Sequence, residues 1–251
     1  MTKFIVANWK MHFTAKDAED YFAAFAGFTK GMSLDQVVFC TPATLYHVAG
    51  KIAKTQKFNI GAQNMHHEPK GAYSGELSAP MIVDAGATYV LVGHSERRLF
   101  FGETDEGCAK KMGVAIANNL VPILCIGETV EEKTGGQTET VLRTQLETAF
   151  GGIDWDTAKN VMVAYEPVWA ISGRGTGLTA TNDEITRIHA FLRKEIDALA
   201  KNKLEIPLFF GGSVNGATSA EIMAIPHVDG VLVGGASLKP DDFAKIVGAG
   251  Q

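Results

Sequence analysis

Short apolar segments alternate with amphipathic segments along almost the whole chain, and this alternation constrains the fold more than any other feature. The apolar segments lack a strict polar/apolar alternation, which is typical of strands that are covered on both faces in a parallel sheet. They are Phe4–Ala7, Val37–Cys40, Phe58–Gly61, Tyr89–Val92, Val121–Ile126, Val161–Tyr165, Leu208–Phe210 and Val231–Val233. The segments that predict helices include Lys16–Lys30, Cys108–Asn119, Glu139–Phe150 and Asn182–Lys201.

A strand followed by a helix, repeated about eight times, predicts an α/β fold of the (β/α)8 barrel type, for which ~250 residues is a typical length. An open sheet of eight strands would produce the same pattern, because periodicity does not show whether a sheet closes. No Pro/Ser-rich or low-complexity tract divides the chain, so we expect a single domain over residues 1–251. Thr181 or Asn182 can cap the helix that follows, with Glu184 in its first turn.

The charge balance argues against several classes of partner. The formal net charge is −5, so we expect no general attraction to nucleic acid or to an anionic membrane, and an anionic ligand must be held by local groups. No apolar run reaches the ~18 residues needed to span a bilayer. The N-terminus enters a strand without the pattern of a signal peptide, which favours a cytoplasmic protein.

The cysteine and histidine patterns give no support to a metal site or a disulfide framework. Cys40, Cys108 and Cys125 are widely spaced and odd in number, which favours reduced thiols. His66-His67-Glu68 precedes a Pro-Lys-Gly turn and is interpreted as a surface loop rather than a ligand set. We therefore expect no metal site.

Polar residues follow several of the predicted strands. In (β/α)8 barrels the functional site lies where the strands end. Asn8 and Lys10 follow the first strand, His94 the fourth and Glu166 the sixth, so these side chains are expected to meet at one mouth of the barrel. From position alone, Glu166 could be a catalytic base or a surface charge, His94 a satisfied polar group and Lys10 a solvated cap.

Glycine-rich turns follow the last two strands. Gly211-Gly212-Ser213 and Gly234-Gly235-Ala236 would expose backbone N–H groups, which bind phosphate well beside a helix N-terminus. The alternative is that both are tight turns that need a positive φ. Because the two turns occur in successive units, we favour phosphate binding.

Six segments, in order and spread over nearly the whole chain, resemble motifs of the triosephosphate isomerase family. They are Asn8–Lys10, Gly93–Arg98, Cys125–Glu128, Ala164–Ala170, Gly211–Val214 and Val233–Leu238. The resemblance implies an enzyme that interconverts dihydroxyacetone phosphate and D-glyceraldehyde 3-phosphate through an enediolate, in glycolysis and gluconeogenesis. It implies no cofactor.

The resemblance also implies a role for each polar residue at the mouth. Glu166 would be the base and His94 would polarise the carbonyl; this family is itself the standard example of a glutamate base beside a histidine kept neutral by a helix N-terminus. Lys10 would stabilise the enediolate and Asn8 would position the substrate. Glu96 would orient Lys10.

The substrate phosphate would be held partly by a lid in which this chain departs from its family. Besides Asn8 and Lys10, the implied binding residues are Gly173, Gly175, Ser213, Gly234 and Gly235. Relative to the usual family sequence, Ser172-Gly173-Arg174 is an insertion, Leu178 replaces a hinge lysine, and Phe210 replaces a tyrosine that latches the lid. We favour Gly175 as the phosphate contact and expect a longer lid to close less completely, because it loses more conformational entropy.

The segment from Gln63 to Glu76 resembles the arm through which this family dimerises, so a C2 homodimer is expected, with Tyr73, Ser74 and Gly75 at its tip. Arg97 and Arg98 are interpreted as part of a structural charge network. The acidic members expected in that network are Glu96, Glu103, Asp105, Glu106 and Glu128.

Two other functions remain open on the residues alone. A phosphate-binding barrel could catalyse epimerisation or aldol cleavage, but these reactions need a metal cluster or a Schiff-base lysine on a strand. Lys10 is the only lysine near a strand end, and no His/Asp ligand set converges. A non-catalytic binding protein is the third reading; the presence of Lys10, His94 and Glu166 argues against it.

Overall fold

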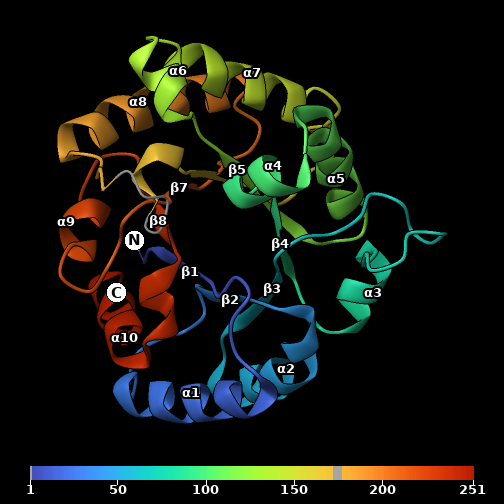
Figure 1. Ribbon diagram of the computed structural model, residues 1–251, viewed down its shortest axis with the longest axis vertical. Helices are drawn as coiled ribbons and strands as arrows, with labels where there is room; N and C mark the ends of the chain where they lie inside the picture. The colour runs from blue at the N-terminus through green and yellow to red at the C-terminus, as the bar shows by residue number, and fades with distance from the viewer. Residues whose placement is uncertain (1, 172–176) are drawn as a thin grey trace.

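The computed structural model describes residues 2–171 and 177–251 and shows a closed barrel of parallel strands surrounded by helices (Figure 1). The strands follow one another in sequence order around the barrel, from β1 (Phe4–Asn8) to β8 (Gly230–Val233). Hydrogen bonding between β1 and β8 closes the sheet. The prediction of a (β/α)8 barrel is confirmed, and the open-sheet alternative is wrong.

The strands start and end within one residue of the apolar runs that predicted them. Between β1 and β8 they are β2 (Val37–Thr41), β3 (Asn59–Ala62), β4 (Tyr89–Val92), β5 (Val121–Ile126), β6 (Met162–Tyr165) and β7 (Leu208–Phe210). Successive side chains in each strand point to opposite faces. Val6, Val38 and Leu91 pack together in one cluster, whereas their neighbours Ile5 and Phe39 join the core shared with the helices. Both faces are apolar, which explains the unbroken apolar runs.

The helices form the outer ring. In the described residues they are α1 (Ala15–Phe28), α2 (Tyr46–Gln56), α3 (Ala79–Asp84), α4 (Ser95–Phe101), α5 (Asp105–Ala117), α6 (Val130–Thr134), α7 (Thr138–Phe150), α8 (Asn182–Leu199), α9 (Ser219–Met223) and α10 (Pro240–Ala249). Short 3-10 turns are η1 (Ala43–Leu45), η2 (Val168–Ala170) and η3 (Gly235–Leu238). Of the helices described, none is long and apolar enough to cross a membrane.

A capping box begins α8 and identifies its cap. Thr181 Oγ1 accepts a hydrogen bond from the Glu184 N–H at 3.2 Å, and Glu184 Oε2 accepts one from the Thr181 N–H at 2.9 Å. Thr181 therefore caps the helix and Asn182 is its first residue. Such a cap stabilises a helix by ~1 kcal/mol.

The cysteines are buried and free. Cys40 and Cys125 face the inside of the barrel, and Cys108 lies on α5. Burial raises the pKa of all three thiols, that of Cys108 to about 12, so they remain protonated and unreactive at neutral pH.

Candidate active site

One small cavity lies at the C-terminal mouth of the barrel, and it gathers residues that are far apart in sequence. Its volume is about 60 Å³. It is lined by Asn8, Lys10, His94, Glu166, Ile171, Gly211, Gly212, Val214, Leu232, Gly234, Gly235 and Ala236. The structure therefore brings Asn8, Lys10, His94 and Glu166 together at a site suited to a small ligand.

The backbone around Lys10 is held in a strained conformation by its neighbours. Lys10 has a φ of 52°, in the left-handed region that costs an L-residue about 1–2 kcal/mol. Its N–H donates to Asn8 Oδ1 at 3.0 Å, and its carbonyl accepts from Gln63 Nε2 at 2.8 Å. Trp9, between Asn8 and Lys10, is fully buried against the rings of Phe22 and Phe39. Both sides of this turn are thus fixed.

The Lys10 ammonium lies between an acidic partner and a glycine turn. Lys10 Nζ is 2.8 Å from Glu96 Oε1, as the implied orienting role of Glu96 requires. A Cβ atom added at Gly234 would lie 3.4 Å from Lys10 Cε and 3.7 Å from Nζ. The positive charge therefore faces the part of the cavity formed by the turn after β8.

His94 is held in one tautomer by the start of α4. It is the N-cap residue of that helix, and its Nδ1 accepts a hydrogen bond from the Glu96 N–H at 3.2 Å. Because Nδ1 is an acceptor, the ring proton lies on Nε2. Nε2 is 3.3 Å from Glu166 Oε1, and both residues line the cavity. This is a neutral imidazole whose N–H donor faces Glu166.

Glu166 follows β6 and is 4% exposed. Its carboxylate contacts His94 Nε2, and its Oε2 lies 3.4 Å from the Ser95 N–H. Burial alone would raise the pKa of this carboxyl, but the hydrogen bonds that it accepts from the His94 ring and the Ser95 N–H, together with the charge of Lys10, outweigh burial and lower the pKa from its usual 4.5. Glu166 is therefore an ionised carboxylate in a nearly water-free position.

The glycines after β7 are required by space, whereas a Cβ would make only ordinary contacts at Gly234 and would meet nothing within 4 Å at Gly235. None of Gly211, Gly212, Gly234 and Gly235 is among the described glycines with positive φ, so the tight-turn alternative is wrong in that respect. A Cβ at Gly211 would lie 2.7 Å from Glu166 Cγ, and one at Gly212 would collide with the ring of Phe210. These positions must be glycine for the base and the cavity to keep their shape.

The remaining predicted phosphate contacts are partly outside what the structure describes. Gly173 and Gly175, with the Ser172-Gly173-Arg174 insertion, lie outside the described residues. Ser213 does not line the cavity, and its hydroxyl donates to the Ala170 carbonyl at 3.0 Å. Phe210 is 3% exposed, with its ring centroid 6.3 Å from that of His189.

Glu128 is not part of the charge network in which it was predicted. Arg97 pairs with Glu103 at 2.9 Å and Arg98 with Asp105 at 2.5 Å, as expected. Glu128 instead accepts hydrogen bonds from Trp169 Nε1 at 2.8 Å and from the Tyr165 hydroxyl at 3.2 Å. Burial raises the pKa of Glu128 despite these hydrogen bonds. The reason is topological: β5 and β6 are neighbours, so the residue after β5 meets the turn after β6.

Sequence reasoning missed the contribution of Gln63 to this site. Gln63 Nε2 donates both to the Lys10 carbonyl at 2.8 Å and to the Cys40 carbonyl at 3.0 Å, so it ties the ends of β1 and β2 together. The sequence pattern predicts Gln63 only as part of the dimerisation arm. Its position directly after β3, where the other site residues also follow strands, was the available signal.

No cluster of metal ligands is found among the residues that the structure describes. Groups of three or more His, Cys, Asp or Glu side chains that could hold an ion are absent from residues 2–171 and 177–251. The rings of His66 and His67 stack on each other at 4.5 Å instead of converging with further ligands.

An ionised carboxylate beside a neutral imidazole and a lysine can move a proton and stabilise the resulting negative charge. At the C-terminal mouth of a closed parallel barrel, this equipment defines a (β/α)8-barrel enzyme of the isomerase class. Within that class, the chain belongs to the triosephosphate isomerase family, whose family model matches residues 3–250.

Similar proteins agree on this family along the full chain. A triosephosphate isomerase of Aquifex aeolicus is 43% identical over 248 residues, covering 98% of this chain and 99% of its own. One from Symbiobacterium thermophilum is 43% identical over 250 residues, covering 99% of this chain and 96% of its own. The crystal structure of the triosephosphate isomerase of Bartonella henselae superimposes with a TM-score of 0.86 at 34% identity, over 99% of both chains.

Proposed function

We propose that this protein interconverts dihydroxyacetone phosphate and D-glyceraldehyde 3-phosphate by moving one proton between adjacent carbons. The observation that carries the proposal is the pairing of an ionised Glu166 with a neutral His94 in one cavity, with the Lys10 ammonium beside it. The reaction needs a base, an electrophile and a cation, and these three groups supply them. Family membership points to the same reaction.

Each side chain acts according to its protonation state. Glu166 removes a proton from the carbon next to the carbonyl and returns it to the neighbouring carbon, while the proton of the substrate hydroxyl passes to the former carbonyl oxygen through His94 Nε2. His94 donates from Nε2 to the carbonyl oxygen, because its Nδ1 is occupied as an acceptor. The negative charge that develops on oxygen is stabilised by Lys10, which Glu96 orients and Asn8 helps to position through the Lys10 N–H.

The substrate phosphate binds at the turns after β7 and β8. Gly234 and Gly235 line the cavity on the side of Lys10, so backbone N–H groups and a cation act on the same anion. Ser213 lies next to Gly212, and its backbone contributes from the turn after β7. From the lid we propose Gly175, rather than Gly173, as the further donor.

We further propose a homodimer joined by the arm between β3 and α3. This segment projects from the side of the barrel (Figure 1), and its residues from Pro69 to Glu76 are exposed. Exposed apolar side chains occur on neighbouring elements, including Met81 on α3 and Phe100 and Phe101 on α4. The arm tip at Tyr73, Ser74 and Gly75 would cover such a surface of the partner subunit.

The proposed reaction and the buried thiols indicate a pathway and a cellular compartment for the protein. We propose that the protein acts in glycolysis and gluconeogenesis in the cytoplasm, where buried reduced cysteines are usual. We also propose that residues 1–251 act as one domain, because the first strand pairs with the last.

The test is a direct measurement of isomerisation in deuterium oxide. Purified protein is given D-glyceraldehyde 3-phosphate, and the products are followed by NMR. We expect dihydroxyacetone phosphate with deuterium on the carbon that received the proton, at a rate unaffected by a metal chelator. Failure of interconversion, or products of carbon–carbon cleavage, would show that the proposed function is wrong.

A further inference from the structure

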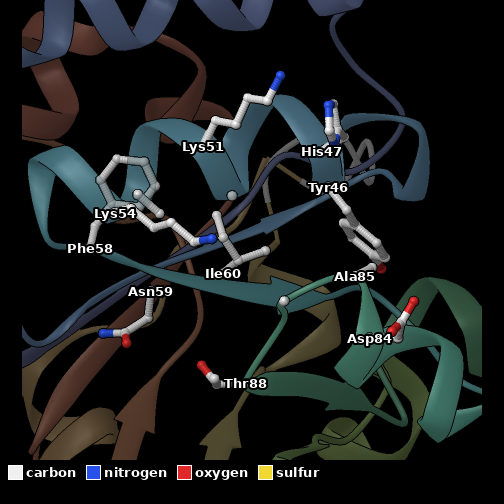
Figure 2. A pocket seen from close by; sticks show the side chains of 13 residues that line it. Tyr46, His47, Lys51, Lys54, Phe58, Asn59, Ile60, Asp84, Ala85 and Thr88 are labelled. Atoms are coloured by element: carbon white, nitrogen blue, oxygen red, sulfur yellow. The ribbon is translucent and has the colours of Figure 1, made fainter.

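Two sides of the helical ring differ in how they cover the barrel. Between α2 and α3 lies a cavity of about 660 Å³, whose large apolar side chains are buried and from which Lys51 and His47 point away (Figure 2). On another side, α7 packs directly against β5 and buries a polar side chain, Gln145, which is 8% exposed. Buried amide groups are nearly always hydrogen-bonded, and the partner of Gln145 leads to the candidate active site.

Both polar atoms of the Gln145 amide bind one residue, Gly127, which directly follows β5. The Gly127 N–H donates to Gln145 Oε1 at 2.9 Å, and Gln145 Nε2 donates to the Gly127 carbonyl at 3.2 Å. Both hydrogen bonds are buried. The amide therefore fixes the peptide groups on both sides of Gly127 at once, which requires a donor and an acceptor on the same side chain.

Gly127 in turn lies against the backbone of Glu166. The Glu166 N–H donates to the Ile126 carbonyl at 2.7 Å, and the Val168 N–H donates to the Glu128 carbonyl at 3.1 Å, so these two hydrogen bonds flank Gly127. A Cβ atom added at Gly127 would collide with the Glu166 carbonyl oxygen and would lie 2.7 Å from its carbonyl carbon. The two chain segments therefore approach more closely than any residue with a side chain would allow.

This close approach connects Gln145 to the Glu166 carboxylate. A shift of Gly127 toward Glu166 would be resisted by contact, and a shift away would pull on the hydrogen bonds that flank it. Either movement displaces the backbone from which the Glu166 side chain reaches His94 Nε2 at 3.3 Å. A misplacement of ~1 Å can cost an enzyme about 100-fold in rate. A group that fixes Gly127 therefore also fixes the carboxylate.

We propose that Gln145 is a positioning residue for the isomerisation: by holding both peptide groups of Gly127, it fixes the backbone and hence the carboxylate of Glu166. The residues that line the cavity at the barrel mouth do not include Gln145, so its effect passes through Gly127. The proposal rests on the proposed function, in which Glu166 is the base.

The first test replaces the amide by a carboxyl group. In Gln145→Glu the protonated carboxyl can still accept from the Gly127 N–H and donate to the Gly127 carbonyl, whereas the ionised carboxylate repels that carbonyl. Burial raises the pKa of the introduced carboxyl, so both forms are accessible. Relative to wild type, we expect kcat to be lower by about tenfold or more at pH 9 and to recover at least about fivefold at pH 6, with KM changed less than about twofold.

Two further variants separate the hydrogen bonds from the added charge. Gln145→Leu removes both hydrogen bonds and should lower kcat about tenfold at both pH values. Gln137→Glu is the matched control, because Gln137 is exposed at the start of the same helix; it should behave like the wild type at both pH values. Thermal melting of each variant reports whether the fold is intact.

A measurement without turnover distinguishes this proposal from the proposed function. The His94 Nε2 proton faces Glu166 Oε1, so its NMR signal reports the position of the carboxylate. It should shift in Gln145→Leu and, at pH 9, in Gln145→Glu, but not in Gln137→Glu. An unchanged signal or kcat in both Gln145 variants, a loss seen in KM instead of kcat, or no recovery at pH 6 would each overturn the proposal. An inactive wild type whose signal shifts as expected would overturn the proposed function and leave the positioning by Gln145 standing.

Discussion

Glu166 and His94 are in direct contact, with Glu166 Oε1 3.3 Å from His94 Nε2. The two groups proposed as base and electrophile are therefore hydrogen-bonded to each other. The same contact, together with the Ser95 N–H and Lys10, outweighs burial and keeps Glu166 ionised.

Shortening the base should remove catalysis while leaving substrate binding nearly intact. In Glu166→Asp the carboxylate retreats by ~1 Å, which can cost about 100-fold in kcat when geometry decides the rate. KM should change little, because the phosphate is held by other groups. Steady-state kinetics check this, with Glu195→Asp on α8 as a surface control. An unchanged kcat would remove Glu166 from the proposed role of base.

Filling the space next to Glu166 should also lower kcat, although the carboxylate itself is unchanged. In Gly211→Ala the new methyl group would lie 2.7 Å from Glu166 Cγ, so the carboxylate has to move. We expect kcat to fall by about 100-fold and the fold to persist. Gly27→Ala is the control, since a Cβ there meets nothing within 4 Å. Equal kcat values in the two variants would contradict the packing argument.

Removing the cation should abolish both turnover and anion binding. Lys10→Met keeps most of the volume but leaves developing negative charge without its partner, so we expect kcat/KM to fall about 100- to 1000-fold. Binding of 2-phosphoglycolate, measured by calorimetry, should weaken as well. Lys16→Met, in which an exposed lysine is lost from α1, should leave both unchanged. Normal affinity of Lys10→Met for the inhibitor would place Lys10 outside the site.

The sequence was sufficient to predict the strands, the start of α8 to within one residue, and the mouth at which the polar residues meet. Each of these depends on local patterns: continuous apolar runs, candidate cap residues Thr181 and Asn182 ahead of Glu184, and polar residues that directly follow strands. Closure of the barrel was not predictable in this way, because it depends on the pairing of β1 with β8.

The features that the sequence did not predict depend on contacts between elements far apart in the chain. Glu128 looked like a partner of nearby arginines, but β5 and β6 bring it to Tyr165 and Trp169. Gln63 looked like part of the arm, but it fastens the Lys10 carbonyl. For Glu128 the charge, and for Gln63 the position in the chain, predicted contacts with residues other than those that the fold brings together.

Placing a charge in the proposed dimer surface should separate the subunits. Phe101 on α4 is 68% exposed, and Phe101→Lys should convert a dimer into a monomer of lower kcat, because a desolvated lysine destabilises the interface. Sedimentation velocity and activity at equal concentration check this. Phe28→Lys on α1, at 53% exposure, is the matched control and should stay dimeric. If the wild-type protein sediments as a fully active monomer, the homodimer proposal is wrong.

A buried histidine should make the protein less stable in mild acid. His189 on α8 is fully buried, and its Nδ1 is 3.1 Å from the His227 carbonyl, to which it donates when neutral. Its Nε2 has no hydrogen-bond partner among the described residues. Burial is the main cause that lowers the pKa of His189 from 6.5 to about 4. His189 therefore binds a proton less readily in the folded protein than in the unfolded chain.

Proton linkage fixes the direction in which the folding stability changes with pH. Between pH 6.5 and 4 the unfolded state binds more protons at this residue, so stability rises with pH across that window and is lost as the pH falls. From pH 7 to pH 5 we expect His189 to account for a loss of about 2 kcal/mol. Denaturant unfolding at both pH values should show this loss in the wild type.

His189→Asn, which keeps a donor for the His227 carbonyl, should be less stable at pH 7 but lose about 2 kcal/mol less on acidification. The exposed His12→Asn should behave like the wild type, and equal pH slopes in all three proteins would show that His189 does not control the acid response.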